Sequence, residues 1–129
     1  MHEREQNQME EADPFSDQNW FVSRTKERIE VGFRGRIAAE DGAASAKAFL
    51  RALGTLPAHV VFDVRRVEGY DGHARLAWQT ALLPRRKQLR SLTVISNSAL
   101  TRMGASVFAL FLGIECILLP RATGHLALA

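Results

Sequence analysis

Hydrophobic and polar residues alternate in short runs near the start of the chain. Residues 20–22 (WFV) precede a polar turn at 25–27, after which Ile29, Val31 and Phe33 alternate with polar or small residues. A period of two is typical of a strand with one buried face. Two such runs joined by a short polar turn therefore predict a hairpin.

The pattern then changes to helical spacing. Apolar residues three and four apart form one stripe over residues 46–53, with Asp41 as the expected N-cap and Gly54 at the expected end. Residues 60–64 (VVFDV) follow as a continuous, largely β-branched run, which is typical of a strand covered on both faces in a parallel sheet. We expect a loop over residues 65–72.

A second helix is expected from His73 to just before Pro84, because apolar residues recur at helical spacing and proline ends a helix. Asp71 is its expected N-cap. The remaining expected elements are a strand at 92–95, a third, broadly apolar helix with positions between 100 and 111, ended by Gly113, and a last strand at 114–119. The order β-β-α-β-α-β-α-β predicts an α/β domain with a mixed, mostly parallel five-stranded sheet.

Composition and charge indicate one small domain with an acidic tail. The chain has 129 residues, of which 47% are hydrophobic, enough for a single core. Residues 1–18 hold six of the 14 acidic residues and one of the 17 basic residues. We expect 1–18 to be disordered, 19–120 to form the domain and 121–129 to be a short tail. The basic body can attract acidic proteins, nucleic acid or anionic lipid, or its charges simply solvate the surface.

The sequence offers little support for a metal, a cofactor or a membrane span. Cys116 is the only cysteine, the four histidines are scattered, and no glycine-rich phosphate motif is present, so we expect neither metal nor cofactor. Residues 100–119 are long enough to cross a bilayer, but Arg102 and Glu115 favour a buried helix followed by a strand. No signal peptide is evident, and we expect a cytoplasmic protein.

The order of elements and one motif resemble the STAS domain, the anti-sigma-factor antagonist family. The motif covers residues 60–74, where a hydrophobic strand leads through a loop to Asp71 and the second helix. The resemblance implies helices packed mainly on one face of the sheet and a protein partner such as a kinase-like anti-sigma factor. Family members carry a phosphorylatable Ser or Thr just after the aspartate, where this chain has Gly72 and His73. The usual phosphoswitch is therefore not expected, and the short C-terminus is a second departure.

The expected partner-binding surface is the loop and the start of the second helix. Its residues are Asp63, Arg65, Tyr70, Asp71, Gly72, His73 and Arg75. A helix that begins at an exposed loop presents free backbone N–H groups, which suit an acidic or phosphorylated partner. Asp63, expected at the carboxyl end of the central strand, either orients this loop toward a partner or accepts hydrogen bonds from its backbone.

Several functions compete at this point. The apolar residues 100–111 favour a carrier of a small ligand or lipid, with a pocket under the last helix. His73 beside Asp71 suggests a hydrolase or transferase, but no nucleophile is evident, and a helix cap beside a surface histidine is the simpler interpretation. The basic residues 85–90 come without a nucleic-acid motif, so no nucleic-acid partner is expected. We expect Trp20 and Trp78 to pack in or near the core. The leading hypothesis is a non-enzymatic protein–protein interaction module in bacterial regulation.

Overall fold

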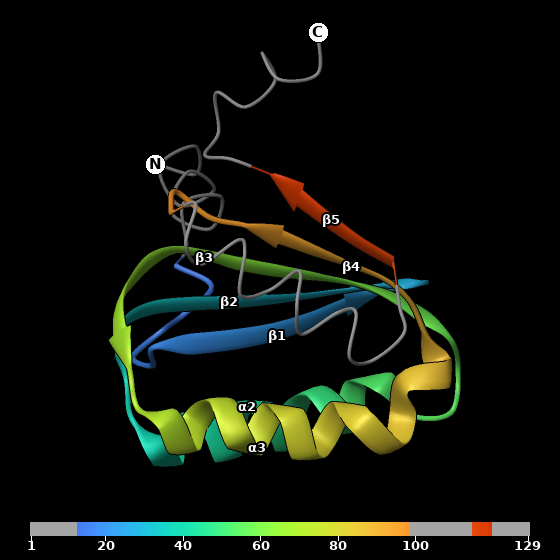
Figure 1. The fold of residues 1–129 in the computed structure, drawn as a ribbon, viewed down its shortest axis with the longest axis horizontal. Helices are drawn as coiled ribbons and strands as arrows, with labels where there is room; N and C mark the ends of the chain where they lie inside the picture. The colour runs from blue at the N-terminus through green and yellow to red at the C-terminus, as the bar shows by residue number, and fades with distance from the viewer. Residues whose placement is uncertain (1–12, 99–114, 120–129) are drawn as a thin grey trace, which may run out of the picture.

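A computed structural model describes residues 13–98 and 115–119, whose strands form one mixed sheet (Figure 1). The strands are β1 (Trp20–Thr25), β2 (Arg28–Ile37), β3 (Ala58–Tyr70), β4 (Leu89–Ile95) and β5 (Glu115–Leu119). They lie in the order β1-β2-β3-β4-β5, with β1 and β2 antiparallel and all other neighbours parallel. The opening hairpin and the mixed α/β class are confirmed.

Two helices cover one face of this sheet (Figure 1). They are α2 (Ala39–Leu53) and α3 (Gly72–Leu82), and a 3₁₀ helix, η1 (Leu83–Gln88), continues from α3 to β4. Both α-helices lie on the same side, as the resemblance implied. The predicted third helix and Gly113 lie outside the described residues.

The ends of α2 show one correct and one wrong prediction. The N-cap is Ala38 and not Asp41, whose carboxylate lies at the third helical position and accepts a hydrogen bond of 2.9 Å from the Ala38 N–H. A carboxylate there satisfies a free donor as a cap would, and it favours the positive end of the helix dipole. The helix ends at Gly54 as predicted, with φ of 55°. A positive φ is strained for residues other than glycine.

β3 is longer than predicted, and the loop expected at 65–72 is wrong. β4 pairs with β3 only as far as Asp63 opposite Ile95, but β2 stays paired with it to Ile37 opposite Tyr70, through two register shifts. One hydrogen-bonded neighbour is enough to keep the backbone extended. Asp63 therefore lies in the middle of the strand and does not end it.

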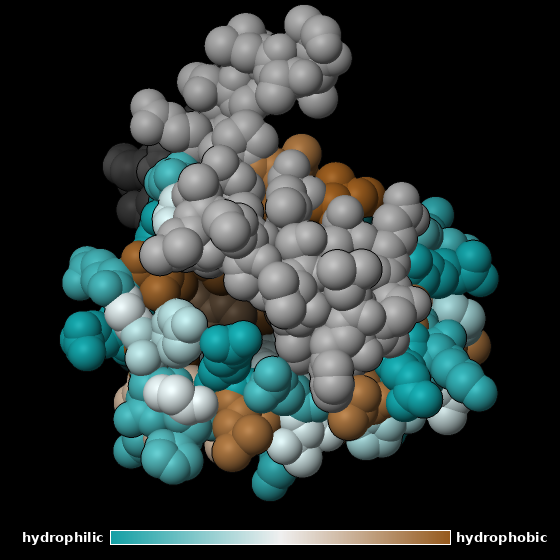
Figure 2. Space-filling model, viewed as in Figure 1, coloured by the Kyte–Doolittle hydropathy of each residue, from teal (hydrophilic) through white to brown (hydrophobic). Residues whose placement is uncertain are grey.

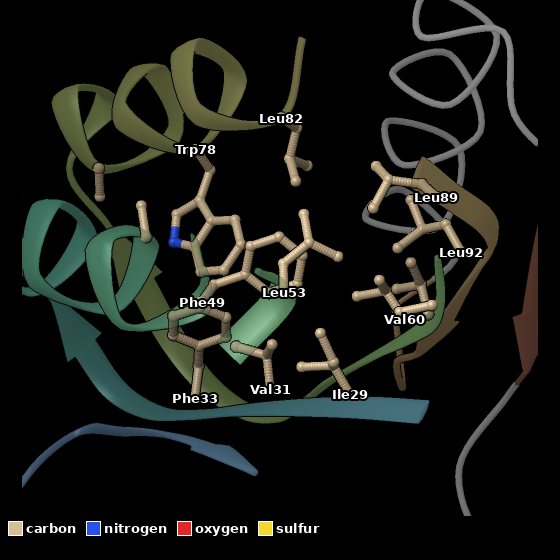
Figure 3. Close-up of a cluster of buried hydrophobic side chains, with 14 of the residues drawn as sticks. Ile29, Val31, Phe33, Phe49, Leu53, Val60, Trp78, Leu82, Leu89 and Leu92 are labelled. Atoms are coloured by element: carbon tan, nitrogen blue, oxygen red, sulfur yellow. The ribbon is translucent and has the colours of Figure 1, made fainter. Parts of the chain in front are cut away.

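The core fills the space between the helices and the sheet (Figure 3). Trp78 is its largest member, with its ring centroid 5.1 Å from those of Phe49 and Phe62. The Trp78 indole N–H donates to the Ser45 hydroxyl at 2.9 Å, which joins α3 to α2. The predicted core position of Trp78 is confirmed, and Trp20 packs, partly buried, against the same cluster.

Within the predicted tail, the side chain of Phe15 packs on the sheet. Phe15 is 6% exposed and meets the Phe21 ring edge-on at 4.9 Å between centroids. The Arg34 guanidinium lies 4.5 Å above the Phe15 ring, within the range of a cation–π contact. The packed part of the chain therefore begins earlier than predicted. The reason is that Phe15, an aromatic residue in a polar segment, packs between Phe21 and Arg34. Residues 1–12 lie outside the described part.

Candidate functional site

The predicted site residues fall into two separate groups. Asp63 and Arg65 lie midway along β3, whereas residues 70–75 form the junction between β3 and α3. An extended strand rises about 3.3 Å per residue, so the Asp63 and Tyr70 backbones lie roughly 23 Å apart. The structure thus places the residues of the predicted docking surface at two positions along β3 and its junction with α3. Residues 70–75 are the group that lies together, at the β3–α3 junction.

Asp63 and Arg65 form a closed ion pair. The Arg65 Nε–H and Nη2–H donate to the two carboxylate oxygens at 3.0 and 2.7 Å, and the Arg65 backbone N–H donates to Oδ1 at 3.2 Å. Partial burial acts to raise the pKa of Asp63, but the Arg65 hydrogen bonds outweigh it and hold that pKa below its ordinary value. The carboxylate is committed to its own neighbour, which favours the structural interpretation of Asp63.

The β3–α3 junction is held on both sides by Asp71. Its backbone N–H donates to the Ile37 carbonyl of β2 at 2.9 Å, and its carboxylate accepts from the His73 N–H at 2.7 Å. Asp71 is therefore the N-cap of α3, as predicted. Tyr70, just before it, is 54% exposed, and Gly72, just after it, has open space on its side-chain face.

His73 closes this turn, and its position corrects one expectation. Its Nδ1 lies 3.0 Å from Asp71 Oδ1, with 81% of the His73 side chain exposed. The His73 backbone N–H, and then its imidazole, hold the pKa of Asp71 below its ordinary value, so the carboxylate is charged at neutral pH. The predicted free N–H at the helix start is thus occupied at His73. A fixed negative charge there repels phosphate, so the helix start does not suit a phosphorylated partner.

The Asp71–His73 pair has part of the geometry of a catalytic dyad but not the rest. Catalysis needs a nucleophile within hydrogen-bond reach of the imidazole, and a site that excludes water. Within residues 13–98 and 115–119, no serine, threonine or cysteine makes a hydrogen bond to His73. The helix cap and surface histidine remain the simpler interpretation.

The described residues contain neither a cluster of metal ligands nor a helix that could span a membrane. There, no three His, Cys, Asp or Glu side chains gather closely enough to hold a metal ion. None of the described helices is long and apolar enough to cross a membrane. The apolar residues 100–111, on which the carrier hypothesis depends, lie outside the described part of the chain.

The basic connection after α3 is folded back on α2. Arg85 Nη1–H donates to the Gly54 carbonyl at 2.9 Å, and Gln88 Nε2–H donates to the same oxygen at 3.0 Å. These bonds satisfy a carbonyl at the end of α2 that has no helical partner. Arg85, which was expected to be a solvated surface residue, therefore stabilises the contact between this segment and the end of α2.

A groove between α2 and α3 was missed by the sequence reasoning. It has a volume of about 590 Å³, and its lining includes His73, Leu50 and Leu76. Leu76 is 55% exposed, since it lies two residues before buried Trp78 and so on another side of α3. The only signal in the sequence was a second, weaker apolar stripe on α3. Arg75, the last predicted site residue, is exposed in the first turn of that helix.

Comparison with known proteins supplies the fold. No protein-family model matches the chain, and no curated protein matches it. Among solved structures, it is similar to an uncharacterized protein of the DUF3478 family from Shewanella loihica PV-4, described as having a SpoIIAA-like fold, with a TM-score of 0.66 over 84% of this chain and 90% of that chain. The chain has a SpoIIAA-like fold. The resemblance to the STAS domain is thereby confirmed as a fold, and the identity of 17% carries it no further.

Within the SpoIIAA-like fold, the candidate site is the β3–α3 junction, residues 70–75, together with the adjoining groove. Both lie on or beside α3, and His73 belongs to both. Asp63 and Arg65 form a separate pair on β3 and are not part of it. The arrangement offers an exposed aromatic ring, a capped helix start and an apolar groove, which are features of a binding surface.

Proposed function

We propose that this chain is a non-enzymatic protein–protein interaction module in bacterial regulation, and that it docks its partner through residues 70–75. The observation that carries the proposal is the exposure of Tyr70, at 54%, beside the start of α3. Tyrosine supplies a large apolar face and a polar hydroxyl, and it is enriched among residues that dominate binding energy. The SpoIIAA-like fold supports this proposal, because the STAS resemblance implies a protein partner.

Rigidity at the β3–α3 junction also supports docking. Asp71 is bonded to the Ile37 carbonyl on one side and to the His73 N–H on the other. The backbone that carries Tyr70 is therefore already fixed before a partner arrives. Binding then loses less conformational entropy than it would at a flexible loop.

Docking at this junction would not be switched by serine or threonine phosphorylation at the usual place. Gly72 and His73 follow the cap residue, and neither has a hydroxyl group. The Asp71 carboxylate already takes the His73 N–H that a phosphate would need. We therefore infer a constitutive interaction, controlled by the amount of partner.

Retention of a partner from native lysate tests the proposal, with Tyr70→Ala compared against Leu56→Ala. Leu56 is a matched control because it is 63% exposed and lies in the turn after α2. We expect wild type and Leu56→Ala to retain one protein in nearly stoichiometric amount, and Tyr70→Ala to retain at least about tenfold less. Circular dichroism should show both variants folded.

Two results would contradict the proposal. One is that no protein is retained specifically, or that Tyr70→Ala and Leu56→Ala retain it equally. The other is a lipid bound to the purified chain in native mass spectrometry with no protein partner, which would favour the carrier hypothesis.

A further inference from the structure

The groove between α2 and α3 lies on the side of the helices that faces away from the core. Its floor and walls are mainly apolar. They include Ala43, Ala46, Leu50, Leu76, Ala77 and Ala81. Over the helices, apolar patches interrupt the mainly hydrophilic surface (Figure 2). The groove is open along its length, so it suits an elongated occupant better than an enclosed small molecule.

The groove has a fixed shape because the two helices are locked together beneath it. Gly42 of α2 lies so close to Ala74 of α3 that an added Cβ would overlap the Ala74 backbone. The Trp78–Ser45 hydrogen bond joins the same two helices one turn further on. Small alanine side chains then line the space above this contact. The axes of packed helices lie 8–10 Å apart, and small side chains at the contact allow the shorter distances. The alanines therefore let a third helix approach closely.

The charge around the groove is positive. Lys47 and Arg85 line it, and no carboxylate of the described residues does. Lys47 is exposed and has no ion pair within that part of the chain, while Arg85 is held in place by the Gly54 carbonyl. His73 lies at one end of the groove, beside the negatively charged Asp71, so the carboxylates of an occupant would lie near Lys47 and Arg85 and away from that end. An occupant with carboxylates beside its apolar face would therefore complement the groove.

We infer that this groove binds an acidic amphipathic helix of the partner protein, with the helix's apolar face on the alanines and its carboxylates near Lys47 and Arg85. The inference rests on the proposed function and names the chemistry of the partner. Binding of this kind is anchored by apolar residues at helical spacing on the incoming helix. A second copy of the chain fits less well, because pairing of identical grooves would place Lys47 and Arg85 against the same cations. A bilayer surface cannot enter a concave groove between two helices.

Photo-crosslinking on the full chain tests this inference. A benzophenone amino acid replaces Leu76 in the groove, Tyr70 at the junction, or Ile117 on β5, which is apolar and 40% exposed, as the control. Each protein is irradiated in native lysate, and the crosslinked peptide is sequenced by mass spectrometry. We expect position 76 to capture a segment with apolar residues at helical spacing and a net negative charge, and position 117 to capture nothing specific.

A pair of charge variants tests the acidic character of the partner helix. Lys47→Glu in the groove should lower the yield of the position-76 adduct roughly tenfold. Arg51→Glu is the matched control, because Arg51 is exposed one turn further along α2 and does not line the groove. It should leave the yield nearly unchanged. Equal yields from Lys47→Glu and wild type would overturn the acidic-helix inference.

The outcomes separate this inference from the proposed function. Crosslinking at position 70 but not at 76 overturns the groove inference and leaves the proposed function standing. A basic or extended segment, a second copy of this chain, or a phospholipid captured at position 76 overturns it as well. No specific adduct at either position contradicts both.

Discussion

The hydrogen bond between Trp78 and Ser45 is the one buried polar link between the side chains of α2 and α3 in the described residues, and its removal has a predictable cost. The indole N–H donates to the Ser45 hydroxyl at 2.9 Å, and that hydroxyl donates to the Gly42 carbonyl at 3.1 Å. Ser45 is 0% exposed and Trp78 7%. Water therefore cannot replace a lost partner without opening the helix pair.

The magnitude follows from what each substitution leaves behind. Ser45→Ala leaves the indole N–H buried without an acceptor, which costs about 1–3 kcal/mol of unfolding free energy. Trp78→Phe removes the donor together with part of a ring packed against Phe49 and Phe62, and we expect a loss of roughly 2 kcal/mol. In the double variant neither donor nor acceptor remains. Its loss should therefore be smaller than the sum of the single losses by about 1 kcal/mol.

The assay is urea unfolding of wild type, the two single variants and the double variant. Far-UV circular dichroism should monitor it, because tryptophan fluorescence changes with the substitution itself. Ser23→Ala is the control, since Ser23 is exposed on β1 and should change stability by less than about 0.5 kcal/mol. Additive losses, or a loss below about 0.5 kcal/mol for Ser45→Ala, would refute this reasoning.

Three further predictions concern the same framework. Gly42→Ala should lower the unfolding free energy by about 1–3 kcal/mol, because its methyl group would push against Ala74; unchanged urea unfolding would contradict this. Arg24→Ala should cost about 1–3 kcal/mol and Arg24→Lys less, since the guanidinium donates to three backbone carbonyls at and after the end of α2; equal thermal stability of all three proteins would count against it. The pKa of Asp63 is lowered in the folded protein, so its pairing with Arg65 stabilises above the ordinary carboxyl pKa and is lost as pH falls through the lowered value. Asp63→Asn should therefore be less stable than wild type at neutral pH and nearly equal to it in acid, as measured by unfolding at both; a constant difference would disprove the linkage.

The elements predicted best from the sequence were those whose signal is local. The hairpin followed from alternation at Ile29, Val31 and Phe33, and the α3 cap from Asp71 ahead of an apolar helical stripe. The N-cap of α2 was predicted three residues too late, at Asp41 instead of Ala38. The reason is that a carboxylate stabilises a helix start either as the cap or at the third helical position.

Features that depend on tertiary contacts were not predictable in this way. β3 continues to Tyr70 because it stays paired with β2. The sequence of residues 65–70 contains no pattern that predicts this pairing. Asp63 and Arg65 are two residues apart, so their side chains lie on the same face of β3. Because a loop was expected from residue 65, the sequence did not predict that they would pair. The α2–α3 groove depends on the close contact of Gly42 with Ala74, which joins segments 32 positions apart.

Docking through residues 70–75 is tested most directly by amide hydrogen exchange of the full chain, free and bound to the partner recovered from lysate. We predict slower exchange on binding in residues 70–75 and on the groove side of α2 and α3, with β1 and β5 unchanged. Protection confined to other surfaces, with residues 70–75 exchanging at the same rate in both states, would contradict docking at the β3–α3 junction.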